Sequence, residues 1–221
     1  MITPQYLLEG TMYALEQCGI LLRDAETLYN KKAYSNAIVL AAFAREELGR
    51  SRILCDLRKR VIDGESVTVE DIRKKYTDHV EKQKWGQLST VQRASDDQGL
   101  GKLLRARHNH LQSEEYQEDD KQLDDITSRQ GKRTPDERHK LRERARYVQL
   151  NDTGTSWNRP CKISQDEARE FLGDAANDYR AEYDRIQQGS IQYIDDELFH
   201  ALQAWPERPE LPRPPWLRDS D

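Results

Sequence analysis

One short stretch of the sequence concentrates arginine and histidine side chains. Arg105, Arg107, His108 and His110 lie within about one and a half turns of an expected helix. An arginine guanidinium can hold a phosphate bidentately, and a histidine exchanges protons near neutral pH. Such a cluster can cleave RNA without a metal, because an imidazole can take the 2′-hydroxyl proton or protonate the leaving 5′-oxygen. An exposed basic helical face produces the same pattern, so this stretch alone does not decide between the two interpretations.

A second candidate site interrupts the apolar pattern of the expected helix that starts at Tyr34. The inward stripe of that helix continues onto Glu47 and Arg50 before it returns to leucine. Burying a charge is costly unless the charge is paired. We therefore expect Glu47 and Arg50 to point inward, where they either pair with each other at i, i+3 or line a polar cleft. Arg45 and Glu46 are then expected on the outside.

Two further polar residues fall on the inner side of the next expected helix. His79 lies on its apolar face, and Lys82 follows about one turn later. A lone histidine in such a position is more often a satisfied core residue. Together with Glu47 and Arg50, however, His79 and Lys82 can form a small polar pocket suited to an anionic group such as phosphate. A buried ion pair that fixes helix register and a functional cleft both remain open interpretations.

The elements that position these residues are expected to be helices. Apolar residues make up 36% of the chain and charged residues 34%, a balance typical of amphipathic helices with solvated outer faces. Capping signals and helical periodicity place the helix starts. The expected helices run from Pro4 to about Asn30, from Tyr34 to before Gly64, from Thr68 through Val80, around Leu100–Leu111, from Pro135 to about Arg146, and from Ser164 through Ile186.

The 221 residues fit one main domain with appendages. We expect a helical domain over residues 1–187, with a solvated insertion at about 112–146 in which an acidic block precedes a basic one. A terminal helix is expected over 188–204. Repeated prolines then make 205–221 an extended tail that can dock through one of its two tryptophans.

Several functional classes are disfavoured by what the sequence lacks. The net charge of −5 means that any nucleic-acid binding must use a local basic patch. The three widely spaced cysteines fit reduced cytosolic thiols better than a disulfide framework or a metal cluster. Neither a signal peptide nor an apolar run of about 20 residues is present, so we expect a cytoplasmic protein without a membrane segment. No phosphate loop, paired-cysteine zinc pattern or nucleophile elbow occurs, and we expect neither metal nor cofactor.

Three stretches of the chain follow one another in a characteristic order. The first is the alanine-rich run that starts at Tyr34 and ends in the Glu-Glu-Leu-Gly-basic segment 45–50. The second is Asp78–Lys82, with histidine and lysine three residues apart. The third is the Arg144–Val148 segment, which the Ser164 helix follows. Together they resemble the AbiV family of bacterial abortive-infection proteins, which belongs to the helical HEPN (higher eukaryote and prokaryote nucleotide-binding) superfamily.

This resemblance implies an all-α, HEPN-like helical bundle and a role in phage defence, in which infected cells shut down growth or protein synthesis. Many HEPN proteins are metal-independent endoribonucleases that use an Arg-x4-6-His motif, two copies of which meet at a dimer interface. Arg105 and His110 satisfy that spacing, although Ala106 stands where a polar residue commonly follows the arginine. The implied activity is RNA cleavage by a homodimer.

Two other functions are compatible with the same residues. A non-catalytic module could bind a phage-encoded activator, an antitoxin partner or a nucleotide through the cleft of Glu47, Arg50, His79 and Lys82. Ala106 and the acidic total charge motivate this alternative. A structural helical protein, in which the buried polar residues only set the register, is the third.

Overall fold

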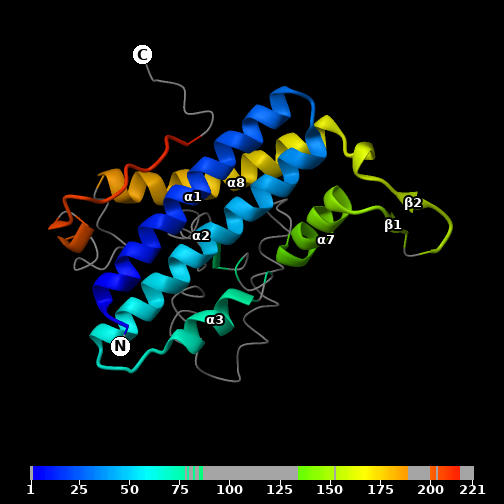
Figure 1. Ribbon diagram of the computed structural model, residues 1–221. Coiled ribbons are helices and arrows are strands. Elements are labelled where there is room, and N and C mark those ends of the chain that lie inside the picture. The colour runs from blue at the N-terminus through cyan, green and yellow to red at the C-terminus, as the bar shows by residue number, and fades with distance from the viewer. Residues whose placement is uncertain are drawn as a thin grey trace, which may run out of the picture.

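The fold is built from long helices and one short hairpin. The computed structural model describes residues 2–77, 79, 82, 85–86, 134–151, 153–188, 200–202 and 204–214. Its elements are α1 (Pro4–Asn30), α2 (Tyr34–Ile62), α3 (Val69–Thr77), α7 (Pro135–Arg146), β1 (Gln149–Leu150), β2 (Trp157–Asn158), the 3-10 turn η1 (Pro160–Lys162) and α8 (Gln165–Gln188). Figure 1 shows α1 and α2 as a long antiparallel pair, which α8 crosses and beside which α7 lies. The expected all-α bundle is confirmed.

Local signals define the ends of the helix pair. The Thr3 side chain accepts a hydrogen bond from the Tyr6 amide, and Pro4 occupies the first turn of α1. After Asn30 the chain reverses through Lys32, whose φ is +61°. Small residues on α2, including Ala37 and Ala41, are fully buried. Their small volume lets the two helices approach closely along the main core.

α7 is part of the bundle, which corrects one expectation. The capping box of Thr134 and Glu137 starts this helix as expected. Its inner face is buried, however, and consists of Arg138, Leu141, Arg142 and Ala145. The prediction of a solvated insertion at 112–146 is therefore wrong for α7, because two arginines at i, i+4 on the buried face made an inward helix look like a basic surface helix.

A smaller second core closes the end of the helix pair near α3. The α3 helix is capped by Thr68, whose hydroxyl accepts from the Asp71 amide at 3.2 Å while the Asp71 carboxylate accepts from the Thr68 amide at 2.8 Å. Ile72 and Tyr76 point from α3 onto this core, as the pattern predicts. The core itself contains Leu7, Ile53, Leu54, Leu57, Val67 and Trp85.

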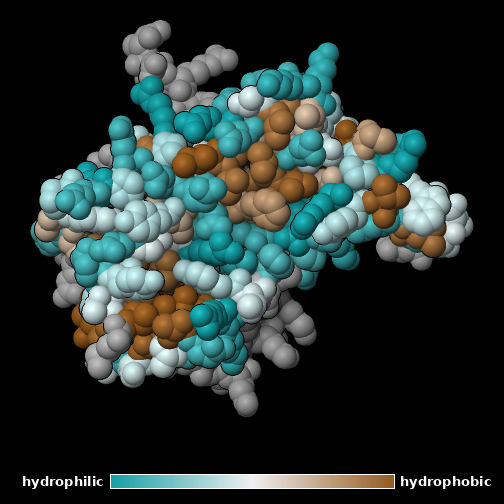
Figure 2. Space-filling view, in the orientation of Figure 1, coloured by the Kyte–Doolittle hydropathy of each residue, from teal (hydrophilic) through white to brown (hydrophobic). Residues whose placement is uncertain are grey.

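The hairpin after α7 projects from the bundle (Figure 1). Strands β1 and β2 are antiparallel, with Leu150 opposite Trp157. Val148 and Trp157 are among the most exposed apolar residues, at 61% and 63%. Elsewhere, Figure 2 shows a mostly hydrophilic face with apolar groups along the helix pair and near α3, as solvated amphipathic helices require.

The proline-rich segment after residue 205 docks onto α1 and α8. The Trp205 ring packs edge-on against Tyr13, with centroids 6.2 Å apart, and the Tyr179 hydroxyl donates to the Pro212 carbonyl at 2.7 Å. Leu211 is buried. Of the expected terminal helix 188–204, residues 200–202 and 204 are described as helical. The expected fourth helix at 100–111, residues 112–133 and Trp216 lie outside the described residues.

Candidate functional site

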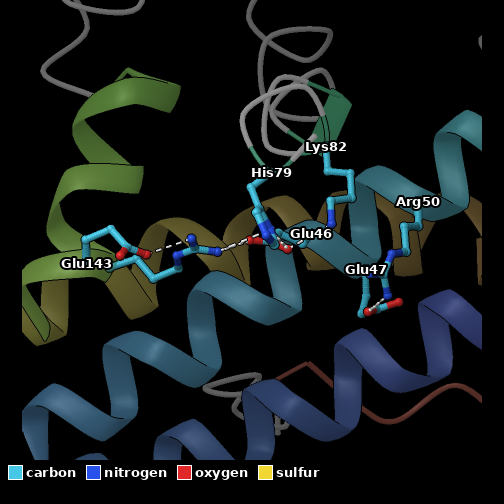
Figure 3. A network of polar contacts seen from close by, with 7 residues as sticks. Glu46, Glu47, Arg50, His79, Lys82 and Glu143 are labelled. Atoms are coloured by element: carbon cyan, nitrogen blue, oxygen red, sulfur yellow. Dashed lines mark hydrogen bonds and ion pairs between the residues drawn. The ribbon is translucent and has the colours of Figure 1, made fainter. Parts of the chain in front are cut away.

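The centre of the candidate site is Glu46, a buried carboxylate on α2. Its Oε1 accepts from Nη1 of Arg142 at 2.6 Å, and its Oε2 lies 2.8 Å from Nδ1 of His79 and 3.1 Å from Nζ of Lys82. Arg142 also donates to Glu143 at 2.8 Å. Figure 3 shows the resulting chain of contacts, which runs from Glu143 on α7 across Glu46 to His79 and Lys82. Two segments distant from α2 in the sequence therefore converge on one of its carboxylates.

Burial differs sharply within this cluster, which we call the Glu46 cluster (Glu46, His79, Lys82, Arg142 and Glu143). The Lys82 side chain is 1% exposed, and those of Glu46 and Arg142 are each 4% exposed. The His79 side chain, in contrast, is 48% exposed. A buried charge is tolerated only when it is paired. Glu46 supplies that partner to both buried cations, while His79 is the member that solvent and ligands can reach.

Two glycines explain how the segment that carries His79 and Lys82 comes so close to α2. A Cβ at Gly49 would lie 1.8 Å from the Lys82 carbonyl oxygen, and a Cβ at Gly86 would lie 2.8 Å from the Arg45 carbonyl oxygen. Neither approach is sterically possible with a side chain. The glycine of the Glu-Glu-Leu-Gly segment therefore lets one backbone rest on another, one turn from Glu46.

A family model described as AbiV matches residues 6–181 of the chain. The chain belongs to the AbiV family. No match was found among curated proteins or among solved structures. The family, which is of HEPN type, supports an abortive-infection function for this AbiV-family protein. The matched range contains every residue of the Glu46 cluster, whereas the docked proline-rich segment lies beyond it.

The expected orientation of the charges on α2 is corrected. Arg45 and Glu46, expected outside, are 1% and 3% exposed, whereas the side chains of Glu47 and Arg50 are 17% and 32% exposed. The expected i, i+3 ion pair between Glu47 and Arg50 is confirmed. The reason for the difference is that α2 is covered by several neighbours. The buried charges Arg45, Glu46 and Arg52 find their partners on other helices, and the apolar stripe alone does not reveal this.

Glu47 and Arg50 form a separate, half-buried pair beside the Glu46 cluster (Figure 3). The Arg50 guanidinium lies 5.3 Å from the centroid of the Tyr76 ring, a cation–π distance. Burial raises the pKa of the Glu47 carboxyl, and the charges of Arg50 and Lys82 only partly offset this effect. His79 and Lys82 thus belong to the same region as Glu47 and Arg50, as expected, but they contact Glu46 instead.

Two more buried ion pairs join α2 to α8. Arg45 pairs with Asp178, and Nη2 of Arg52 lies 2.6 Å from Oε2 of Glu182. The arginines are seven residues apart on α2 and the acids four apart on α8, so both pairs lie along one helix crossing. No short motif could identify these pairs, because each joins residues more than a hundred positions apart. These two ion pairs hold α2 and α8 together and are not part of the candidate site.

Sequence reasoning also missed Arg142 and Glu143. Both lie in a basic helix that was expected to be solvated, and only its i, i+3, i+4 spacing from Arg138 to Ala145 could have revealed an inner face. The other predicted site residues, Arg105, Arg107, His108 and His110, lie outside the described residues.

In the described part of the chain, no group of three or more histidine, cysteine, aspartate and glutamate side chains could hold a metal ion. The three cysteines are free, and burial raises the pKa of the Cys18 thiol well above its usual range. Among the described residues, no helix combines the length and apolarity that a membrane span requires. A pocket of about 300 Å³ lies between α7 and α8, and its lining includes Arg144 and Glu167, which form an ion pair.

Proposed function

We propose that this AbiV-family protein is an anti-phage effector that cleaves RNA without a metal and so stops translation or growth of the infected cell. The observation that carries the proposal is the Arg105-x4-His110 spacing within a chain that belongs to a HEPN-type family. In this proposal Arg105 holds the scissile phosphate, and His110 exchanges a proton with the reacting oxygens. Arg107 and His108 add further contacts to the RNA backbone.

The Glu46 cluster supports the proposal through its charges. Within the cluster, the carboxylates of Glu46 and Glu143 balance the cations of Lys82 and Arg142, and the half-exposed imidazole of His79 lies beside these paired charges. Proton transfer by histidine needs no metal. We also propose that the effector is a homodimer, as expected where two Arg-x4-6-His motifs must meet, and light scattering of the purified protein tests this.

The decisive assay incubates the purified protein with total bacterial RNA in EDTA. Cleavage is expected to leave 2′,3′-cyclic phosphate and 5′-hydroxyl ends, which mass spectrometry identifies. Arg105→Ala and His110→Ala are each expected to lower the rate by about 10²-fold or more. Arg23→Ala, which removes an exposed arginine from α1, is the matched control. Equal cleavage by His110→Ala would remove His110 from the mechanism, and cleavage that EDTA abolishes would overturn the metal-independent proposal.

A second function is favoured by a different observation. Ala106 departs from the usual motif, and the Glu47–Arg50 pair with Tyr76 presents charge and aromatic surface beside the Glu46 cluster. A non-catalytic module would use this surface to bind a phage-encoded activator, an antitoxin or a nucleotide. Plaque assays distinguish the two functions. If the module is correct, Arg50→Glu abolishes protection while Arg105→Ala leaves it intact, whereas the RNase predicts loss with Arg105→Ala.

A further inference from the structure

We infer that His79 is a second proton-transfer residue of the RNA-cleavage reaction, with Nε2 as the reacting atom and Glu46 as the positioning residue that orients its ring. The inference rests on the proposed function. It extends that function by one residue: cleavage moves two protons, of which His79 takes one and His110 gives the other.

The distances around His79 select one tautomer of its imidazole ring. Nδ1 lies 2.8 Å from Oε2 of Glu46, and 3.3 Å from Nη1 of Arg142. A carboxylate oxygen is only an acceptor, so a contact as short as 2.8 Å requires that Nδ1 carries the hydrogen. The 3.3 Å contact between Arg142 and Nδ1 is then the weaker of the two. Nε2 keeps its lone pair in the neutral ring, and the hydrogen bonds of His79 to the described residues all involve Nδ1.

Glu46 is held too firmly to turn away from the ring. Oε1 is occupied by Arg142 at 2.6 Å, and Oε2 is shared between His79 and Lys82. The carboxylate is 4% exposed, while the His79 side chain is 48% exposed. A buried carboxylate that fixes the tautomer of an accessible histidine is the arrangement that prepares an imidazole for acid–base chemistry.

The reaction can be written with both protons accounted for. Nε2 of His79 takes the proton of the ribose 2′-hydroxyl as the 2′-oxygen attacks phosphorus and the new 2′-O–P bond forms. The P–O5′ bond breaks, and the leaving 5′-oxygen receives a proton from the imidazolium of His110. The products are a 2′,3′-cyclic phosphate and a 5′-hydroxyl, and exchange with water restores both histidines.

The groups that face His79 set how this reaction responds to pH. Among the described residues these are Glu46 on α2, Arg142 and Glu143 on α7, and Lys82 on the same helical segment. The two acids balance the two cations in charge. A base must be neutral, and histidine side chains change charge between about pH 5 and 8. Because the base must be neutral and the acid His110 must be protonated, kcat/KM should follow a bell-shaped pH profile, in which the rise on the acidic side belongs to the base.

The first test measures kcat/KM against pH for the wild type and for His79→Gln with an RNA oligonucleotide. We expect His79→Gln to lose about 10²-fold in rate and the rise at acidic pH. His79→Ala should recover activity on addition of imidazole, which a structural defect would not do. His139→Gln on α7 is the matched control, and circular dichroism verifies folding. An unchanged rate and pH profile in His79→Gln would overturn the inference while leaving the proposed RNase intact.

Glu46→Gln tests the positioning role. It should lower kcat with little change in KM, since the residue does not touch the substrate. A second measurement is independent of activity: nitrogen-15 NMR of the wild type, with His79 assigned from its variant, should show hydrogen on Nδ1. Hydrogen on Nε2 of the neutral ring would overturn the geometry. If the wild type cleaves no RNA, the proposed function fails, and the catalytic role of His79 fails with it.

Discussion

Arg142 of α7 and Glu46 of α2 are 96 positions apart in the sequence, and Nη1 of the arginine donates to Oε1 of the glutamate at 2.6 Å. Both side chains are 4% exposed. This contact ties α7 to the long helix pair at the point where His79 and Lys82 also reach the same carboxylate. The stability of the bundle and the geometry of its candidate site therefore depend on one residue.

Replacement of Glu46 by alanine should be strongly destabilising. The substitution leaves Lys82 and Arg142 buried without their carboxylate, which costs about 3–5 kcal/mol for a broken buried pair. Urea unfolding of the purified protein measures the change. Glu47→Ala is the matched control on the same helix, because it removes only a half-exposed i, i+3 pair and should cost less than about 1 kcal/mol. Equal losses in the two variants would contradict the role of Glu46 as the shared partner.

Gly49→Ala should destabilise the protein even though alanine favours helix. The added Cβ would lie 1.8 Å from the Lys82 carbonyl oxygen, so the two backbones must separate, at a cost of about 1–3 kcal/mol. Gly173→Ala is the control within α8, where a Cβ meets nothing within 4 Å. That variant should gain about 0.5–1 kcal/mol from helix propensity. Thermal unfolding compares them, and a stabilised Gly49→Ala would show that the close crossing is absent.

Helix ends could be predicted from the sequence because their causes are local. The Thr134–Glu137 capping box and the Ser164–Glu167 box each lie within four residues, and both form the expected hydrogen bonds. The i, i+3 pairing of Glu47 with Arg50 is equally local. Such features require no knowledge of the rest of the fold.

The centre of the site could not be predicted in the same way. Glu46 points inward because Arg142, His79 and Lys82 contact it from two other segments. Arg45 points inward because it forms an ion pair with Asp178 of α8. Helical periodicity identifies an apolar stripe, but it does not show how many neighbours a helix has. A helix that is covered on several sides also buries charged residues that lie outside its apolar stripe, although the stripe alone predicts that they are exposed.

The stability that Glu167 contributes at the start of α8 should decrease as the pH falls. Burial would raise the pKa of Glu167, but hydrogen bonds from the Ser164 amide, the Arg144 guanidinium and the Ser164 hydroxyl lower it below its ordinary 4.5. A lowered folded-state pKa means that the ionised carboxylate adds stability above about pH 4.5, and that this is lost as the pH falls further. Glu167→Gln should therefore cost about 1 kcal/mol at pH 7, and the difference from wild type should shrink below pH 4.5.

Glu47→Gln provides the comparison of opposite sign. Burial raises the pKa of Glu47 in the folded state, so its ionisation weakens folding as the pH rises above the ordinary 4.5. The unfolding free energy of wild type minus that of Glu47→Gln should thus fall with rising pH. The corresponding difference between wild type and Glu167→Gln should rise. Urea unfolding between pH 3 and 7 measures both. Parallel slopes would contradict the two environments seen in the structure.

The last prediction concerns the proline-rich segment that crosses α1. A Cβ at Gly19 would lie 2.5 Å from the Tyr179 hydroxyl oxygen and 2.8 Å from Cβ of Pro212. Because Tyr179 is fully buried and cannot retreat, Gly19→Ala should displace the segment and break the Tyr179–Pro212 hydrogen bond at 2.7 Å. A glutamate-specific protease should then cleave after Glu210 several-fold faster than in wild type, as mass spectrometry would show.

Gly10→Ala is the control on the same helix. There the new Cβ meets only the end of the Leu54 side chain, at 3.0 Å, and a flexible side-chain end can move aside. Cleavage after Glu210 should stay at the wild-type rate in this variant. If Gly19→Ala also left the rate unchanged, the segment would not be held by Gly19 and Tyr179, because a docked backbone resists proteolysis only while its contacts persist.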